Sequence, residues 1–446
     1  MKVFRDLEPA LRRNLIIFFC ASLCFWAGLA GMLPNLSLYI ESFGASNQEI
    51  GWVMAAFAIG LLGLRPRMSQ FIDNKGRKPA LLIGIVVIAI APLLYLSVSL
   101  APNVLIDLPK LAISFNPDFS IDLSQTTQVK SSILLLAAAR AFHGISIAAF
   151  ATAYTASVAD MAPPHQRGEL IGYMSLASPV GMALGPALGG YLEGSFTFAF
   201  LTMTLLGVVG TLCVFLKKEP TRHVVDGGTS PTEDNQPKKK PLFWSLLLTA
   251  PIRVPALILF MVGTAFGTMV AFIPLHVREL GIEVNIGLIY TVSAIASFSI
   301  RALAGRASDQ LGRGRFISMG LIFYTLAMFT LSVSTNAPML LLAGAFQGAG
   351  GGTLIPIIAA LMADRSRPGE RGITFGLCLT GFDLGIALAG PIMGRIADAS
   401  TYSLVFAIAG CMTLSGLLVF VTNSSKDVPH SVRFALNGGR DVYAVK

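Results

Sequence analysis

The sequence predicts an all-α membrane protein of twelve transmembrane helices, arranged as two pseudo-symmetric bundles of six helices. Three observations support this prediction: an apolar composition, twelve long apolar runs, and a pattern of charged and glycine residues that occurs once in each half. Of the 446 residues, 54% are hydrophobic and only 13% are charged. This balance is too apolar for an ordinary soluble domain of this length, so the chain is expected to cross a membrane many times.

Apolar runs of about twenty residues are long enough to cross a hydrocarbon core about 30 Å thick. Twelve such runs occur, at residues 14–40, 47–68, 79–100, 131–157, 169–192, 196–216, 252–276, 286–307, 316–334, 337–361, 373–394 and 403–422. The expected units are an N-terminal six-helix half (1–217), a linker rich in Pro, Gly, Asp and Lys (218–250), a C-terminal six-helix half (251–423) and a tail (424–446).

Two stretches of the first half recur in the second half. Residues 65–77 align with residues 301–313 at an offset of 236 residues. At an offset of 204 residues, four positions match, namely Gly144, Asp160, Arg167 and Gly168 with Gly348, Asp364, Arg371 and Gly372. A membrane chain built twice from one plan is typical of a transporter, because alternating access is largely the rocking of two halves about a site between them.

The two offsets differ by 32 residues, which places an insertion near residues 101–130, between the third and fourth spans. It contains two short apolar runs, 104–108 and 119–123, and the alternation in the second run predicts a small hairpin. Two interpretations of the insertion are open: an ornamental loop, or a lid or partner site.

The distribution of Lys and Arg predicts the orientation of the chain. If the N-terminus is cytoplasmic, 28 of the 33 Lys and Arg residues lie on the cytoplasmic side. Both termini and the linker are therefore expected in the cytoplasm, in a multi-pass protein of the plasma (inner) membrane. The net charge of +9 is then explained by topology and by contact with anionic lipid headgroups, and no nucleic-acid partner is expected.

Other functional classes lack support in the sequence. The five cysteines all lie within predicted spans, at no metal-ligand spacing, and are expected to be free thiols. There is no Walker sequence, no His-Glu-x-x-His and no nucleophile elbow. We therefore expect no enzymatic activity, no metal and no cofactor.

The charged part of the repeat has a defined motif. Gly-x-x-x-Asp-x-x-Gly-Arg is complete in the second half, at Gly305, Asp309, Gly312 and Arg313. It places a carboxylate about one turn from a guanidinium in a short loop, a pair that can clamp neighbouring helices and release them. The motif resembles the signature loop of the major facilitator superfamily. The first copy keeps the charges at Asp73 and Arg77 but has Ser69 where the family usually has Gly, and both copies are expected to gate the cytoplasmic side.

Two ionisable residues are expected within spans. Arg140 lies ten residues, about 15 Å, in from Lys130, and Asp383 lies twelve residues, about 18 Å, past Arg371. Arg140 with Gly144 resembles the buried arginine motif of exporters of the superfamily, to which a role in proton coupling is attributed. We expect Asp383 to bind the coupling proton and Arg140 to tune this event, with room for a water between them. Two alternatives stay open: an Arg140 that snorkels or ties helices together, and a protonated Asp383 with a structural role.

Glycines recur at every fourth position in the fifth span. Gly181, Gly185 and Gly189 form a flat strip on one helix face, where another helix can approach closely, and Pro186 adds a bend. This pattern closely resembles the antiporter motif of drug/proton antiporters, and generic helix packing is the alternative interpretation.

A central cavity is expected to hold the substrate. His143 and Gln347 occupy equivalent places in the two halves, 204 residues apart. With Trp26, Asn35 and Tyr154 they are candidates for the cavity lining, although each one alone is consistent with ordinary packing.

The resemblance implies a secondary transporter that exports a small apolar or amphipathic molecule in exchange for protons, with lipids as its surroundings and the monomer as its functional unit. One alternative is a proton-linked uptake carrier for sugars or organic acids, which would be indicated by a cavity rich in paired charges and carboxamides. Another is a transporter-like sensor, which would need a folded cytoplasmic domain. The tail after Thr422 is too short to be such a domain.

Overall fold

A computed structural model describes residues 7–109, 112–114, 120–122, 126–161, 167–192, 194–216, 249–367, 371–439 and 441–445. Twelve of its helical segments are long and apolar enough to cross a membrane. This confirms the all-α fold with twelve spans, and most span boundaries agree with the sequence prediction within a few residues. The expected linker, 218–250, lies almost entirely outside the described residues.

The first half contains α2 (Pro9–Ala30), α3 (Leu33–Ser42), α4 (Asn47–Lys75), α5 (Arg77–Val98), α6 (Ser131–Met161), α7 (Arg167–Ser175), α8 (Ala177–Tyr191) and α9 (Phe196–Leu216). The second half contains α11 (Ala250–Glu279), α12 (Ile286–Leu311), α13 (Arg313–Ser332), α14 (Ala337–Asp364), α15 (Arg371–Ala399) and α16 (Tyr402–Asn423), and α17 (Val428–Asn437) follows it. Helices α2 and α3 form one span, and α7 and α8 lie in another.

Prolines explain why these two spans are interrupted. Pro34 and Pro179 lack the N–H groups that would bond the carbonyls four residues earlier, and α2 and α7 end at those earlier residues, Ala30 and Ser175. Within a membrane, a broken helix is tolerated where its freed backbone groups find other partners. At the second break the hydroxyl of Tyr154 donates to the carbonyl of Met174 at 3.0 Å.

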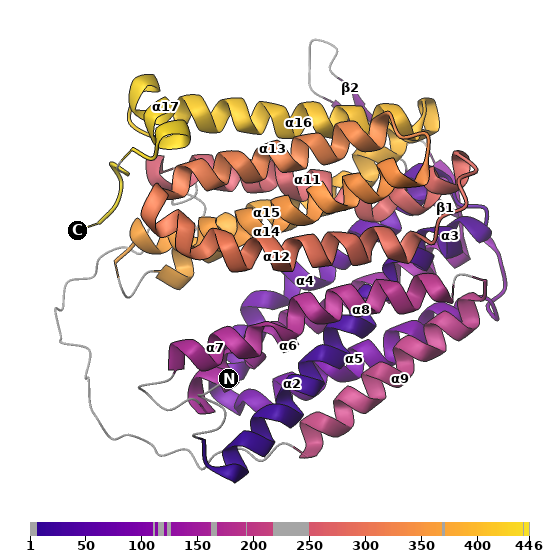
Figure 1. Cartoon of the computed structure of the whole chain (residues 1–446). Coiled ribbons are helices and arrows are strands. Elements are labelled where there is room, and N and C mark those ends of the chain that lie inside the picture. Colours follow the sequence, from indigo (N-terminus) through magenta and orange to yellow (C-terminus); the bar gives the residue numbers. More distant parts are fainter. Residues whose placement is uncertain are drawn as a thin grey trace.

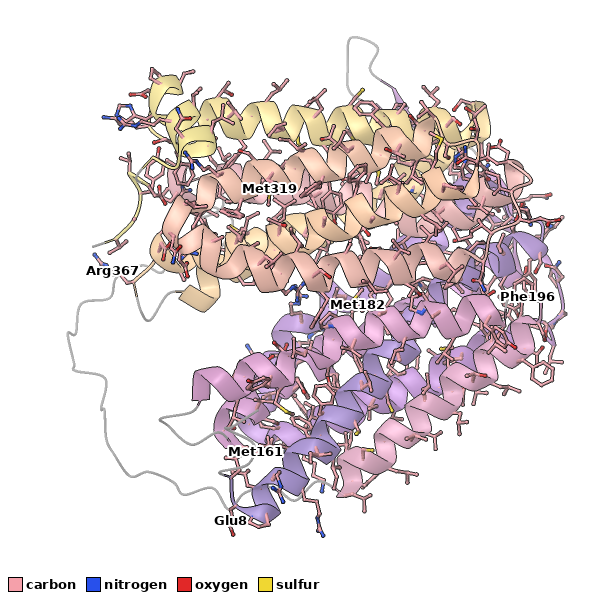
Figure 2. The ribbon with its side chains drawn as sticks, in the orientation of Figure 1. Glu8, Met161, Met182, Phe196, Met319 and Arg367 are labelled. Carbon is pink, nitrogen blue, oxygen red and sulfur yellow. The ribbon has the colours of Figure 1, made fainter. Side chains whose placement is uncertain are left out.

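The two halves meet mainly along two helix pairs, α4 with α15 and α8 with α12, and α3 also contacts α11. In Figure 1 the halves converge at the end that carries β1 and α3 and diverge toward the end where the C-terminus lies. We call these ends the insertion side and the linker side. Figure 2 shows the same arrangement in its labelled residues: Met182 lies where the halves meet, whereas Met161 and Arg367 lie on separate arms at the linker side.

The insertion forms a nested hairpin. Strand β1 (Leu105–Pro109) pairs antiparallel with β4 (Thr126–Lys130), and β2 (Ala112–Ser114) pairs antiparallel with β3 (Ser120–Asp122). The strands therefore use both apolar runs that the sequence indicated. Lys130 anchors the base of the hairpin, because its ammonium group donates to the carbonyl of Phe43 at the end of α3, at 2.9 Å.

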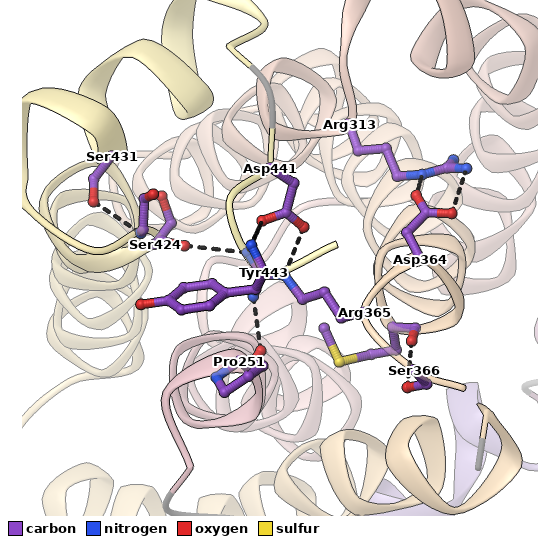
Figure 3. A network of polar contacts seen from close by, with 11 residues as sticks. Pro251, Arg313, Asp364, Arg365, Ser366, Ser424, Ser431, Asp441 and Tyr443 are labelled. Carbon is purple, nitrogen blue, oxygen red and sulfur yellow. Dashed lines mark hydrogen bonds and ion pairs between the residues drawn. The ribbon is translucent and has the colours of Figure 1, made fainter. Parts of the chain in front are cut away.

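The tail folds back onto the linker-side end of the second half (Figure 3). The guanidinium of Arg365, whose side chain is 1% exposed, pairs with Asp441 through two hydrogen bonds of 2.7 and 3.1 Å. The same group donates to the carbonyls of Pro251 (2.7 Å) and Ser424 (3.1 Å). One side chain thus ties the ends of α11, α14 and α16 to the tail, an ordered arrangement that the sequence prediction of a plain tail missed.

Candidate functional site

Asp383 on α15 forms an ion pair with Arg65 on α4 of the other half. The side chain of Asp383 is 7% exposed and that of Arg65 is 33% exposed. Asp383 lies seven residues, about 10 Å along α15, from Gly390, at whose carbonyl α4 and α15 pack tightly. The carboxylate therefore joins the two halves near the middle of the span, further toward the linker side than the close backbone contact.

Sequence reasoning identified Asp383 but missed its partner. Arg65 opens the repeated stretch, yet a basic residue near the end of an apolar run is ordinarily read as an orientation signal. Its position inside the predicted span 47–68 was the available clue, because an arginine there needs a partner or water.

Arg140 does not contact Asp383 among the described residues, but lies in a separate buried cluster of the first half. Its side chain lies over the ring of Phe57, 4.6 Å from the centroid, and its Nη1 atom is 3.4 Å from Nδ1 of His143. The hydroxyl of Tyr95 is 3.2 Å from the same nitrogen. Within the described part of the chain, Nε of Arg140 and Nε2 of His143 have no hydrogen-bond partner. The cluster links α4, α5 and α6, and the Nε–H group of Arg140 can still donate a hydrogen bond.

Gln347 has a matching place in the second half, with different chemistry. Its amide nitrogen donates to the hydroxyl of Tyr324 at 3.3 Å, and its amide oxygen accepts a hydrogen bond from Ser293. Tyr324 and Tyr95 both lie on the third span of their half. His143 and Gln347 are thus equivalent in position, as the offset indicated, but each bonds within its own half.

Two of the five expected cavity residues line one pocket. Trp26 and Tyr154 line a half-open pocket of about 120 Å³ between α2, α6, α7 and α8. Asn35 is buried instead at the contact of α3 with α8, where its amide donates to the carbonyl of Gly189 at 2.7 Å. Asn35, His143 and Gln347 do not line this pocket, and each is used in a hydrogen bond or close contact between neighbouring helices. A cavity lined by all five residues stays a prediction.

The glycine strip of α8 lies directly against the first span. A Cβ atom at Gly185 would lie 2.3 Å from the carbonyl oxygen of Ala27, and one at Gly189 would lie 2.1 Å from that of Gly31. At Gly181 the added atom would be 2.6 Å from Cβ of Trp26. Pro186 lies within α8, and its carbonyl group faces α12 instead of the first span. The strip therefore permits a backbone contact that any larger residue would block.

The charged loops are each bonded to their own half. Nε of Arg77 lies 3.2 Å from a carboxylate oxygen of Asp160, at the end of α6. Arg313 pairs with Asp364, at the end of α14, and with Asp309 at 2.9 Å. The sequence showed that Asp160 and Asp364 repeat, but not that they are the partners of the two arginines. The side chains of Ser69 and Asp73 lie outside the described part of the chain.

A group of polar contacts joins the halves at the insertion side, and sequence reasoning missed it. Glu41 at the end of α3 forms an ion pair with Arg278 on α11. Asp398 at the end of α15 accepts hydrogen bonds from the backbone at the start of α4, and Tyr402 donates to the side chain of Asn47. These residues lie hundreds of positions apart, so no local pattern in the sequence could pair them.

Twelve spans in two pseudo-symmetric halves, joined at one end and separated at the other, define the class of membrane transporters that work by alternating access. The sequence model of the Major Facilitator Superfamily matches residues 16–305 and 256–438. The chain therefore belongs to the major facilitator superfamily and is a multi-pass membrane transporter of small molecules, not an enzyme.

The chain is similar to Multidrug resistance protein 2 of Bacillus subtilis, with 23% identity over 403 residues, covering 87% of this chain and 90% of that protein. It is 25% identical over 434 residues to Multidrug resistance protein MdtG of Salmonella paratyphi C, covering 93% and 95%. Among solved structures, the D-xylose-proton symporter matches with a TM-score of 0.68 and 16% identity, covering 94% and 98%. The nucleoside transporter NupG matches with a TM-score of 0.67 and 12% identity, covering 93% and 98%.

Proposed function

We propose that the protein exports a small apolar or amphipathic molecule in exchange for protons. The observation that carries this proposal is the ion pair between Asp383 and Arg65, because it places a titratable carboxylate at a contact between the two moving halves. A proton on Asp383 removes one charge of the pair and weakens the link between α4 and α15. Proton binding and the rocking of the halves are thereby coupled through one side chain.

Arg140 has an indirect part in this proposal. It carries a positive charge into the first half and lies against Phe57 of α4, the helix that also carries Arg65. Its effect on Asp383 therefore passes through the position of α4 and the local field, not through a direct bond. His143 contacts the guanidinium and is itself contacted by the hydroxyl of Tyr95.

The pocket at the α7–α8 break is the candidate substrate site. Its wall combines the rings of Trp26 and Tyr154 with the hydroxyl groups of Ser22, Thr155 and Ser175. It contains no charged or carboxamide side chain. Such a surface suits an apolar or amphipathic molecule with few polar groups, in keeping with relatives named multidrug resistance proteins. It offers less to a sugar or organic acid, which is the alternative substrate class.

We further propose that the linker side faces the cytoplasm, in the plasma membrane, and that the monomer is the working unit. The 28 basic residues assigned to that side support this orientation. Single cysteines introduced at Ser120, in the insertion, and at Asn235, in the linker, test it in intact cells. Ser120→Cys should react with an impermeant maleimide and Asn235→Cys should not; the reverse pattern would invert the topology.

Purified protein in proteoliposomes tests the proposed activity. With an imposed pH gradient, amphipathic drugs should move against the direction of proton flow, and sugars and organic acids should not move. Movement of a sugar in the same direction as protons would replace the export proposal with the uptake alternative. A gradient-independent flux of every substrate tested would contradict proton coupling.

A further inference from the structure

We propose that Asp398 is the latch that holds the insertion side closed, by capping the first turn of α4 from the opposite half. This inference rests on the proposed alternating-access function and adds a gating residue to it. The carboxylate lies at the end of α15 and uses both oxygen atoms: Oδ1 accepts from the backbone N–H of Asn47 at 2.8 Å, and Oδ2 accepts from that of Gln48 at 3.0 Å.

The start of α4 offers N–H groups to these acceptors at an exposed place on the insertion side. The first N–H groups of a helix have no partner within the helix. Ser46, the residue before α4, satisfies only one of them, through a hydrogen bond of 3.2 Å from the N–H of Glu49 to its hydroxyl. Asn47 and Gln48 are satisfied by Asp398, which belongs to the other half. The positive end of the α4 dipole also favours a carboxylate at this place.

Neighbouring contacts hold Asp398 in register with α4. A Cβ atom at Gly394, one turn before Asp398, would lie 2.3 Å from the carbonyl oxygen of Asn47, so the two backbones already touch. Tyr402, just after α15, donates to the side chain of Asn47. The Glu41–Arg278 ion pair adds a second cross-half link at the same end.

Among the described residues, the second helix pair, α8 with α12, has no such carboxylate from the opposite half. The N–H of Gly287 in the first turn of α12 is bonded, at 2.8 Å, by the side chain of Asn285 from its own half. Opening the insertion side therefore leaves this cap of α12 intact. The same movement separates Asp398 from two N–H groups of α4. The free-energy cost of opening therefore arises mainly from the α4–α15 contact.

The test compares Asp398→Ala with Ser46→Ala in purified protein whose five native cysteines are replaced by serine. Both substitutions remove acceptors from the same helix turn, but only Asp398→Ala breaks a link between the halves. Two single-cysteine reporters are labelled with maleimide in detergent. Thr291→Cys lies in the closed α8–α12 interface, and Thr155→Cys lies in the pocket wall.

Asp398→Ala should raise the labelling rate of Thr291→Cys about fivefold and lower that of Thr155→Cys, because the population moves toward a state open at the insertion side. Ser46→Ala should leave both rates unchanged. Unchanged rates in Asp398→Ala would overturn the latch, and so would equal effects of the two substitutions. A rise at both reporters would also overturn it, since it would identify Asp398 as a folding residue. Labelling needs no substrate, so its outcome is independent of whether transport is proton-coupled.

Discussion

The α4–α15 and α8–α12 pairs join the same two halves. Their backbones approach each other equally closely, but the charged side chains at the two contacts differ. Gly51 and Gly287 stand 236 residues apart at matching positions of the repeat. A Cβ atom at Gly51 would lie 2.0 Å from the carbonyl oxygen of Gly390, and one at Gly287 would lie 2.1 Å from that of Pro186. The repeated plan therefore produces the same close contact twice.

The charges follow a different rule. At α4–α15, Arg65 pairs with Asp383 and Asp398 caps α4. At α8–α12 the corresponding arginine, Arg301, has no carboxylate partner within the described part of the chain, and the cross-half hydrogen bond runs from the hydroxyl of Thr291 to the carbonyl of Ala183 at 3.4 Å. The comparison indicates that both interfaces share the close backbone contact, whereas, among the described residues, the Arg65–Asp383 ion pair and the Asp398 cap occur only at α4–α15.

The largest expected effect comes from removing the titratable group of the charged interface. Asp383→Asn should lower uphill export driven by a pH gradient about a hundredfold, because the amide keeps the shape of the carboxylate but binds no proton. Downhill exchange of substrate should persist. Proteoliposome flux with and without the gradient separates the two activities. Wild-type uphill export at normal expression would leave Asp383 with a structural role.

The two arginines offer a matched comparison between the interfaces. Arg65→Gln should lower uphill export about tenfold, because release of the proton from Asp383 no longer restores a cross-half ion pair. Arg301→Gln, at the matching position of the other interface, should change it less than about twofold. Equal losses in the two variants would show that coupling is distributed over both interfaces.

A steric change should affect the α8–α12 interface without touching Asp383, the proposed proton site. A Cβ atom at Gly190 would lie 2.5 Å from the backbone nitrogen of Gly287, so Gly190→Ala should push α8 from α12 and cost about 1–3 kcal/mol of stability. Thermal unfolding in detergent measures this loss. Gly172→Ala, where the added atom meets nothing within 4 Å, is the control in the same span. The pH dependence of transport should be the same in both variants.

A substitution in the tail, away from both interfaces, should have a smaller effect on transport. Asp441→Asn leaves the buried guanidinium of Arg365 without its carboxylate and should lower the thermal stability of the protein by about 3 kcal/mol, with transport reduced only in proportion to the folded fraction. A change in the apparent affinity for substrate, at full folding, would contradict a purely structural role for the tail.

The smallest effect is expected at the exposed cap of α17. Hydrogen bonds from His430 hold the pKa of the Asp427 carboxyl below its ordinary value. The contribution of Asp427 to stability is therefore present at neutral pH and is lost as the pH falls through the lowered pKa of the folded protein. Asp427→Asn should thus lower the melting temperature slightly at neutral pH and not at all in strong acid. An undiminished difference in acid would assign the effect to the shape of the side chain.

Much of the fold could be predicted because lipid imposes strong local rules. Apolar runs of fixed length set the twelve spans, and the repeats set the two halves. The contact of Arg313 with Asp309 lies within the motif, but the pairing of Arg65, Arg77 and Arg313 with Asp383, Asp160 and Asp364 could not be predicted, since each of these carboxylates comes from a distant segment brought near by helix packing. The sequence could not assign the cavity lining for the same reason: polarity at mid-span marked Asn35 and Gln347, but packing decides whether such a residue faces a cavity or a neighbouring helix.

The most direct test of the account is the proton released when substrate binds. Purified wild-type protein in a weakly buffered solution with a pH indicator should release about one proton per bound substrate, because the proposed mechanism links occupancy of the pocket to protonation of Asp383 through the movement of α4 and α15. Asp383→Asn should bind the same substrate and release none. Undiminished release from Asp383→Asn, with normal binding, would contradict the assignment of the coupling proton to the Asp383–Arg65 pair.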